Sequence, residues 1–124
     1  MKINECVMIE AFKCNEEDTV VEVAKKLKMI TLRHIFVVDS KDYPTGIISV
    51  IDINNRVVAE GKDASKMKAK EIMSKVVDVA KAEEDVDGFF KKLMEKGHVM
   101  APVVEGGKMT GVITINQLIK CKSE

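Results

Sequence analysis

Residues 16–27 read EEDTVVEVAKKL, and residues 83–93 repeat that pattern as EEDVDGFFKKL. Downstream, the segment 34–53, HIFVVDSKDYPTGIISVIDI, returns at 100–118 as MAPVVEGGKMTGVITINQL. Equivalent residues lie about 66 positions apart, and about 65 apart beyond a turn that is one residue shorter in the second copy. A repeat of this size predicts two related units that usually cannot bury their apolar faces alone. We therefore expect the copies to pack against each other and function to lie in the cleft between them.

Composition narrows the classes of function. The chain has 124 residues, and its 20 basic and 20 acidic side chains give a formal net charge of zero. This balance indicates neither a broad nucleic-acid-binding face nor an acidic tail. The segment 62–75 is locally basic, but four Phe and one Tyr in the whole chain offer it no stacking platform, so we interpret it as solvated. We expect no nucleic-acid partner.

The sequence also bears on the compartment. No apolar run approaches the length of a membrane span, and the first five residues do not resemble a signal peptide. Cys6, Cys14 and Cys121 are an odd number with no close pairing, which favours a reducing compartment over a disulfide framework. We therefore expect a cytoplasmic protein with no membrane partner.

Each copy changes its hydrophobic period in the same order. Val20, Val23 and Leu27 recur at helical spacing after a cap at Asp18 or Thr19, and short runs of β-branched residues follow. The pattern predicts helices over 20–30, 52–60, 85–96 and 116–121, with a short one over 68–73. It predicts strands over 8–13, 35–39, 46–50, 76–80, 101–105 and 110–114.

Each unit is thus predicted to be β-α-β-β-α, which is an α+β fold with helices on one face of a small sheet. The predicted organisation is a first repeat over 1–60, a linker over 61–66 and a second repeat over 67–124.

The segment Gly46-Ile47-Ile48-Ser49-Val50-Ile51-Asp52 resembles the Gly-x-x-Ser/Thr-x-x-Asp element of the cystathionine-β-synthase (CBS) domain. The apolar strands at 35–39 and 101–105, each ending in an acid, are also similar to that family, as is Met73-Ser74. The resemblance covers about residues 6–121, and the chain looks like a stand-alone tandem pair. It implies two repeats packed about a pseudo-two-fold axis through their sheets.

Tandem pairs of this family typically bind AMP, ADP, ATP or S-adenosylmethionine between the repeats, so the resemblance implies an adenosine-containing effector and no required cofactor. A carboxylate can accept charge-assisted hydrogen bonds from both ribose hydroxyls, and a helix N-terminus favours a phosphate. The resemblance implies a first ligand site made of Ile47, Ser49, Asp52, Met73, Val77, Asp78, His98, Val99 and Met100. It implies a second, weaker site made of Val7, Ala11, Phe12, Leu32, Arg33, His34, Thr114 and Gln117.

The second motif departs from the family pattern. Gln117 replaces the expected Asp, and the loss of charge assistance is worth on the order of 1 kcal/mol. Phe36 stands where the family often has Pro, as Pro102 does in the second copy, and Phe12 can fill part of the second pocket. We therefore predict two unequal sites, the one at Asp52 being the stronger.

Alternatives remain open. Ser49 and Asp52 also fit a plain helix cap, with the carboxylate serving the amides of Asn54 or Asn55. The chain would then be a structural interaction module that binds protein and no nucleotide. No hydroxyl–His–carboxylate set, paired carboxylates or metal-ligand spacing is visible, so we expect neither an enzyme nor a metal site, a small hydrolase or transferase being the third option.

The expected partners are proteins as well as the ligand. Because no effector domain is fused to the repeats, an effector on another chain is expected. The resemblance also implies a homodimer, and the apolar faces of the helices at 20–30 and 85–96 are its predicted surfaces.

Overall fold

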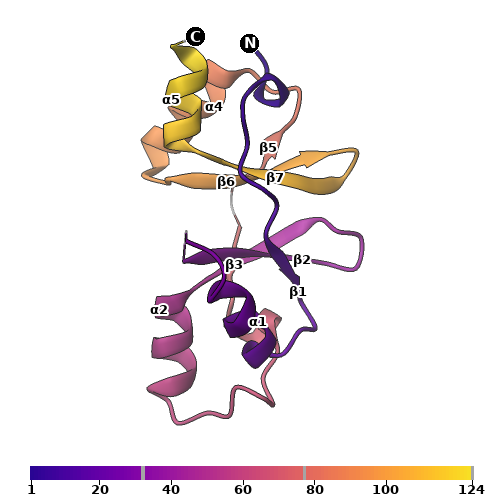
Figure 1. Cartoon of the computed structure of the whole chain (residues 1–124), viewed down its shortest axis with the longest axis vertical. Coiled ribbons are helices and arrows are strands. Elements are labelled where there is room, and N and C mark those ends of the chain that lie inside the picture. The colour runs from indigo at the N-terminus through magenta and orange to yellow at the C-terminus, as the bar shows by residue number, and fades with distance from the viewer. Residues whose placement is uncertain (32, 77, 124) are drawn as a thin grey trace. The chain divides into compact units, whose positions relative to one another are not determined.

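The computed structural model describes residues 1–31, 33–76 and 78–123 and contains two compact units (Figure 1). Unit 1 combines Met1–Ala11 with Val77–Glu124, and unit 2 is Phe12–Val76. Each unit is a small mixed sheet with helices, so the α+β prediction is confirmed. The compact units are not the predicted repeats, since the first eleven residues join the C-terminal half of the chain. The repeat bounds of 1–60 and 67–124 therefore stay a prediction. The segment 61–66, expected to link the repeats, lies within unit 2.

Unit 2 is built on a four-stranded sheet of order β1-β2-β3-β4. β1 runs parallel to β2, and the β2–β3 and β3–β4 pairs are antiparallel. Its strands are Lys13–Asn15, His34–Val38, Pro44–Ser49 and Ser74–Lys75. Its helices are α1 (Val20–Leu27), α2 (Val50–Ile53), the π-helix η2 (Asn54–Val58) and α3 (Ala69–Ile72).

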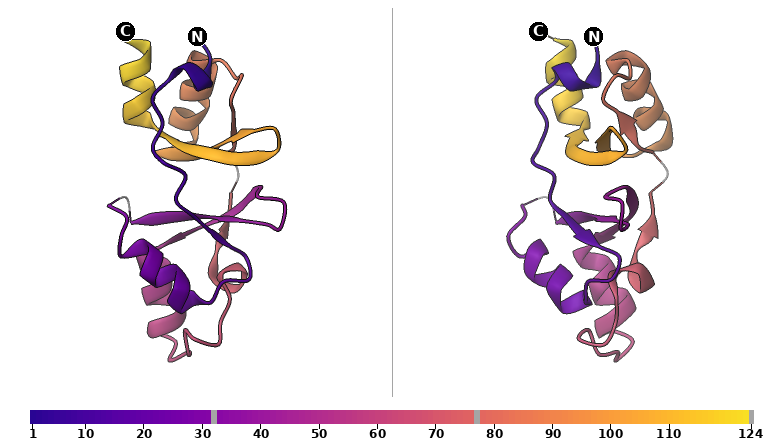
Figure 2. Two further views of the ribbon diagram at one scale, coloured as in Figure 1. Left: turned by 45° about the vertical axis from the view of Figure 1, so that its right-hand side comes forward. Right: turned by 90° about the vertical axis from the view of Figure 1, so that its right-hand side faces the viewer.

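Unit 1 has a three-stranded sheet of order β5-β6-β7, in which β5 runs parallel to β6 and the β6–β7 pair is antiparallel (Figure 2). Ile9 extends this sheet through an antiparallel bridge to Val112. The strands are Ala80–Lys81, Met100–Glu105 and Lys108–Thr114. The helices are the 3-10 helix η1 (Ile3–Glu5), α4 (Val86–Lys96) and α5 (Ile115–Lys122).

Helix boundaries follow from the caps that the sequence supplies. Thr19 accepts a hydrogen bond from the amide of Glu22, whose side chain accepts from the amide of Thr19, and α1 begins there. Asp85 caps α4 by one hydrogen bond, from the amide of Gly88, and this glycine has no side chain to complete a capping box. Gly97, at φ 70°, ends α4 in the left-handed conformation that glycine adopts without strain.

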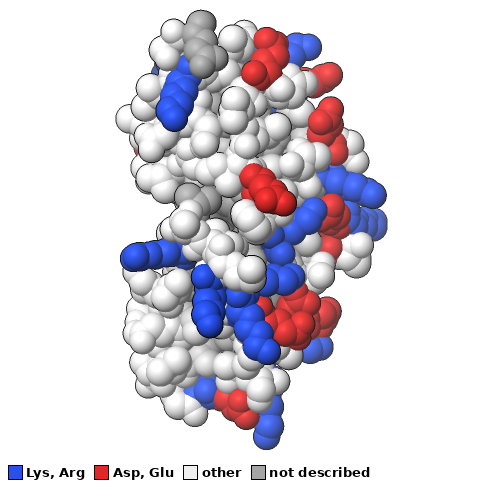
Figure 3. Space-filling view, viewed as in Figure 1, with Lys and Arg blue, Asp and Glu red and all other residues white. Residues whose placement is uncertain are grey.

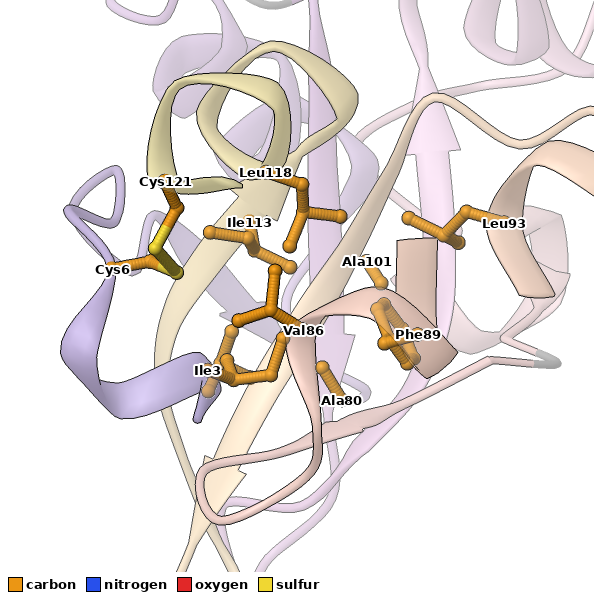
Figure 4. Packing of buried hydrophobic residues seen from close by; sticks show 11 residues of the cluster. Ile3, Cys6, Ala80, Val86, Phe89, Leu93, Ala101, Ile113, Leu118 and Cys121 are labelled. Atoms are coloured by element: carbon orange, nitrogen blue, oxygen red, sulfur yellow. A yellow bond between two sulfur atoms is a disulfide. The ribbon is translucent and has the colours of Figure 1, made fainter. Parts of the chain in front are cut away.

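Each unit has a separate apolar core. In unit 2, one stripe of α1 packs with β2, β3, α3 and η2; the core residues are Cys14, Val20, Val23, Leu27, Ile30, Ile35, Val37, Ile48, Val57, Ala69 and Ile72. In unit 1, α4 and α5 pack with the sheet and η1 (Figure 4); the core residues are Ile3, Cys6, Ala80, Val86, Phe89, Leu93, Ala101, Val103, Ile113, Leu118 and Cys121.

Two predicted strands are divided by the structure. The segment 8–13 gives only the Ile9 bridge to unit 1, and β1 begins at Lys13 and pairs in unit 2. The segment 76–80 likewise contains just the start of β5, while β4, at Ser74–Lys75, pairs earlier. The expectation of one continuous strand in each copy was wrong, because residues 8–13 contact one sheet at Ile9 and the other at Lys13, and β4 and β5 belong to different sheets.

The cysteine interpretation also needs correction. Cys6 and Cys121 form a disulfide across a sequence separation of 115 residues, seen in Figure 4 between η1 and α5. Cys14 is the free, buried cysteine. Sequence spacing hid the pair because its two residues meet only when the N-terminal segment folds onto the C-terminal helix.

Candidate functional site

The Ser49/Asp52 motif forms a closed capping box at the start of α2. The Ser49 hydroxyl accepts from the Asp52 amide at 3.1 Å, and Oδ2 of Asp52 accepts from the Ser49 amide at 2.8 Å. The carboxylate therefore serves Ser49 rather than Asn54 or Asn55, so that detail of the capping alternative was wrong. A carboxylate has about four acceptor positions. The cap occupies one, and the remaining capacity suits a diol.

Ile47 and Met73 lie beside this motif in unit 2. Ile47 pairs with Ser74 across the β3–β4 ladder, one residue beyond Met73. Met73 lies against Gly46 so closely that a Cβ added to the glycine would sit 2.3 Å from its sulfur. The structure therefore brings together all four first-site residues that belong to this unit, namely Ile47, Ser49, Asp52 and Met73.

Sequence reasoning missed Arg56, one turn beyond Asp52. Its guanidinium donates to the carbonyl of Ile72 and, at 3.3 Å, to the hydroxyl of Ser74. Its Nη2 also lies 3.9 Å from Oδ1 of Asp52. The i,i+4 spacing of Asp52 and Arg56 on a predicted helix was the available signal.

The second motif repeats the cap without a carboxylate. The Thr114 hydroxyl accepts from the Gln117 amide at 3.2 Å and donates to Oε1 of Gln117. The side-chain oxygen that would meet a ribose is thus a neutral amide already bonded within the motif. This arrangement is consistent with the prediction of a weaker second site.

Asp78 of unit 1 is held by the side chains of Lys96 and His98. It accepts from Lys96 at 2.7 Å and lies 2.9 Å from Nδ1 of His98. Burial acts to raise the pKa of Asp78, but the hydrogen bonds from Lys96 and His98 outweigh it and lower the pKa. Both carboxylate oxygens have protein partners, so Asp78 is less available to read an adenine edge than the sequence suggested.

The remaining candidate residues flank the two motifs at the strand ends. In unit 2, His34 is the register partner of Ser49, and the carbonyl of Arg33 accepts from Val50. In unit 1, Met100 is the register partner of Thr114, and the carbonyl of Val99 accepts from Ile115. The other wall residues assigned to the second site, Val7, Ala11 and Phe12, precede β1. Leu32 and Val77 lie outside the described residues.

The predicted dimer surfaces are occupied. The apolar stripes of α1 and α4 belong to the cores of their own units, so those helix faces cannot also cover a second copy. Exposed apolar side chains occur off these stripes: Met94 on α4 is 56% exposed, and others line a groove in unit 2. A groove of about 340 Å³ between α1 and α2–η2 is lined by Ala24, Leu27, Lys28, Val50, Ile53, Asn54 and Val58. Val50 is 49% exposed and Val58 66%.

Charged side chains of both signs adjoin each other on the face seen in Figure 3. In the basic segment 62–75, Lys68 and Lys70 both bond Glu17, and these hydrogen bonds lower the pKa of Glu17 to about 2. Across residues 1–31, 33–76 and 78–123, no three His, Cys, Asp or Glu side chains are grouped to hold a metal ion. Within the same ranges, no helix has the length and apolar character that crossing a membrane requires.

Comparison with known proteins identifies a family that matches both halves of the chain. A model of the CBS domain matches residues 4–59 and again 69–124. An uncharacterised protein of Methanopyrus kandleri is 31% identical over 104 residues, covering 83% of this chain and 53% of that protein. The chain thus spans about half the length of this relative.

Two solved structures share the fold. A CBS domain pair in complex with 5′-methylthioadenosine and S-adenosyl-L-methionine has a TM-score of 0.75 at 22% identity, covering 99% of this chain and 96% of that one. The CBS domain of a bacterial CNNM/CorC family Mg²⁺ transporter in complex with ATP has a TM-score of 0.78 at 19% identity, covering 97% and 85%.

Proposed function

Because this chain belongs to the CBS domain family and contains two such domains, we propose that it is a regulatory module that binds an adenosine-containing ligand. The two structural neighbours described above were solved with adenosyl ligands, which supports the ligand class. The observation that carries the proposal is the Ser49/Asp52 motif. Its carboxylate is fixed by the cap and retains acceptor positions for a ribose diol.

Regulation follows from linkage. A ligand that contacts both repeats favours one arrangement of them. A partner that binds this arrangement preferentially then responds to the ligand, to the extent that the ligand's affinity differs between the two arrangements. We propose an effector protein on another chain and a cytoplasmic location, although the Cys6–Cys121 disulfide removes the cysteine pattern as an argument for a reducing compartment. Binding and its readout need no bond-breaking step, so we propose no enzymatic activity and no required cofactor.

We also propose a homodimer, now placed on the groove between α1 and α2–η2 rather than on the apolar stripes of the helices. Val50 and Val58 expose apolar surface at this groove, which a second copy would cover. Light scattering of the wild type and of Val58→Glu tests this: a dimer that the charge converts to a monomer is expected, whereas a monomeric wild type refutes it.

The ligand proposal is tested by exchanging the two motifs. Calorimetric titration with AMP, ATP and S-adenosylmethionine is expected to show binding to the wild type that weakens about tenfold or more in Asp52→Gln, because a charged acceptor is lost. Gln117→Asp is the matched variant and is expected to strengthen the second site. No binding of any of the three ligands at millimolar concentration would instead favour a structural interaction module, and turnover of the nucleotide would favour an enzyme.

A further inference from the structure

Arg56 connects two separate segments of unit 2. Its guanidinium bonds the carbonyl of Ile72 and the hydroxyl of Ser74, which lie on either side of Met73. The same group faces Asp52 on its own helix. One side chain therefore touches both the acidic residue and the Met73 segment of the proposed ligand site.

The helix that carries Arg56 is a π-helix. The amide of Ala59 bonds the carbonyl of Asn54 at 2.8 Å, and the amide of Lys62 bonds that of Val57 at 3.0 Å, both with the i,i+5 spacing. Such segments are rare and are often found at functional sites. Here the wider turn begins at Asn54, two residues after Asp52. The equivalent helix of unit 1, α5, is a regular α-helix.

Unit 1 has a covalent link at the equivalent place. The repeat offset of 66 relates Ile72 to Cys6, and the offset of 65 that follows the hairpin relates Arg56 to Cys121. Cys6 and Cys121 form the disulfide. In unit 2 the link joins the end of α3 to η2, and in unit 1 it joins the end of η1 to α5. Each unit therefore links the short helix at its sheet edge to the helix that follows its hairpin.

Backbone bonds confirm that the two segments are equivalent. In unit 2, the amides of Ala69 and Lys70 bond the carbonyls of Asp18 and Glu16. In unit 1, the amides of Ile3 and Asn4 bond the carbonyls of Glu84 and Ala82, which are the residues 66 positions away in each case. The segment therefore makes equivalent backbone hydrogen bonds in both units. The side-chain link differs: it is a hydrogen bond from Arg56 in unit 2 and the Cys6–Cys121 disulfide in unit 1.

We propose that Arg56 is a positioning residue of the adenosyl site: it fixes the Met73–Ser74 segment against the helix that carries Asp52. This inference rests on the proposed function. Hydrogen bonds from a guanidinium to a carbonyl and a hydroxyl are directional, so they set the spacing between Met73 and Asp52. Ile72 stays anchored in the core, but the stretch beyond it pairs with β3 through a strand of two residues, so loss of the guanidinium loosens Met73 and Ser74.

The first test is Arg56→Gln, with Lys70→Gln as the matched control. Lys70 lies on α3 in the same segment, and its replacement removes the same charge but leaves the contacts to Asp52 and Ser74 intact. We expect Arg56→Gln to weaken AMP, ATP and S-adenosylmethionine about tenfold, and amide exchange in residues 72–76 to accelerate about tenfold. The control is expected to change neither.

The second test restores the link by other chemistry. Arg56→Cys combined with Ile72→Cys copies the pair of unit 1, and Ile72→Cys alone is its control. Glutathione disulfide oxidises the two thiols by exchange: a protein S–S bond forms, and the reagent's S–S bond is reduced to two glutathione thiols. Slow exchange and ligand affinity are expected to return in the oxidised double variant and to be lost on reduction. The wild type is measured under both conditions.

The outcomes separate the two claims. Unchanged exchange and affinity in Arg56→Gln overturn the inference, and so does an equal loss in Lys70→Gln, which would indicate a general effect of charge. Weakened binding that the oxidised double variant does not recover also overturns it. If the wild type binds none of the three ligands, the proposed function fails, and the exchange data alone decide whether Arg56 holds the segment.

Discussion

Reduction of the Cys6–Cys121 disulfide should destabilise unit 1 far more than unit 2. The disulfide connects η1 to α5, and both elements contribute to the core around Phe89. The segment that it anchors also carries Ile3, which is fully buried in that core. Once the bond is reduced, backbone hydrogen bonds and the burial of Ile3 still hold this segment in the folded state, and no new contact forms there. The unfolded chain, in contrast, gains conformational entropy because its loop is no longer closed.

The magnitude follows from the closed loop. A sequence separation of 115 residues corresponds to about 4.7 kcal/mol if the whole chain unfolds together, in the loop-entropy treatment. If unit 2 stays folded, the flexible part is roughly half as long and the contribution is about 4 kcal/mol. With a urea dependence of roughly 1–2 kcal/mol per molar, the midpoint should fall by about 2–4 M.

Urea titration monitored by circular dichroism measures this shift, with and without a phosphine reductant. Intact mass confirms reduction through the gain of two hydrogens. The variant Cys6→Ser with Cys121→Ser should unfold at the lower midpoint in both conditions. A midpoint that is equal for the oxidised and fully reduced wild type would refute the reasoning.

Three further predictions concern single residues. Burial raises the pKa of Cys14 to about 12, so iodoacetamide should label none of the native oxidised protein and one cysteine after unfolding; labelling of the native form would contradict the burial. Gly88→Ala should raise the free energy of unfolding by about 1 kcal/mol in urea titrations, because the new Cβ meets only a carboxylate oxygen at 3.6 Å; a loss of stability would contradict this. The lowered pKa of Asp78 means that it contributes stability above its unfolded pKa of about 3.9, which is lost as the pH falls through the folded value. Asp78→Asn should therefore reduce the fall of the melting temperature with pH below about pH 4, and an unchanged acid profile would count against this role.

The repeat predicted much of the fold because its signals are local. Helical spacing and the cap at Thr19 act within a few residues, and the structure confirms them. The hairpins were also predictable, since each consists of two apolar runs around a short turn. The Ser49/Asp52 motif could be located for the same reason, since its hydrogen bonds span three residues.

The features that the sequence did not reveal depend on contacts between distant segments. The division of the strands upstream of each first helix arises because a short extended segment can give edges to two sheets, which periodicity cannot distinguish from one longer strand. The Cys6–Cys121 pair and the contact of Arg56 with Ile72 join residues far apart in the chain. Neither pairing has a spacing rule that sequence reasoning could apply.

Two side-chain differences between the units, at the acid of the motif and one turn later, fall on the stretch of helix that follows each hairpin. In unit 2 that helix carries Asp52 and, one turn later, Arg56. At the same positions in unit 1, α5 carries Gln117 and Cys121. A carboxylate and a guanidinium one turn apart support each other, whereas an arginine beside Gln117 would have no anionic neighbour on its own helix. The loss of the acid and the replacement of the arginine are therefore changes to one local electrostatic unit. If unit 1 needs only a stable segment and unit 2 needs one positioned for a ligand, a covalent bond suffices in the first and a polar link that also contacts the acid is required in the second.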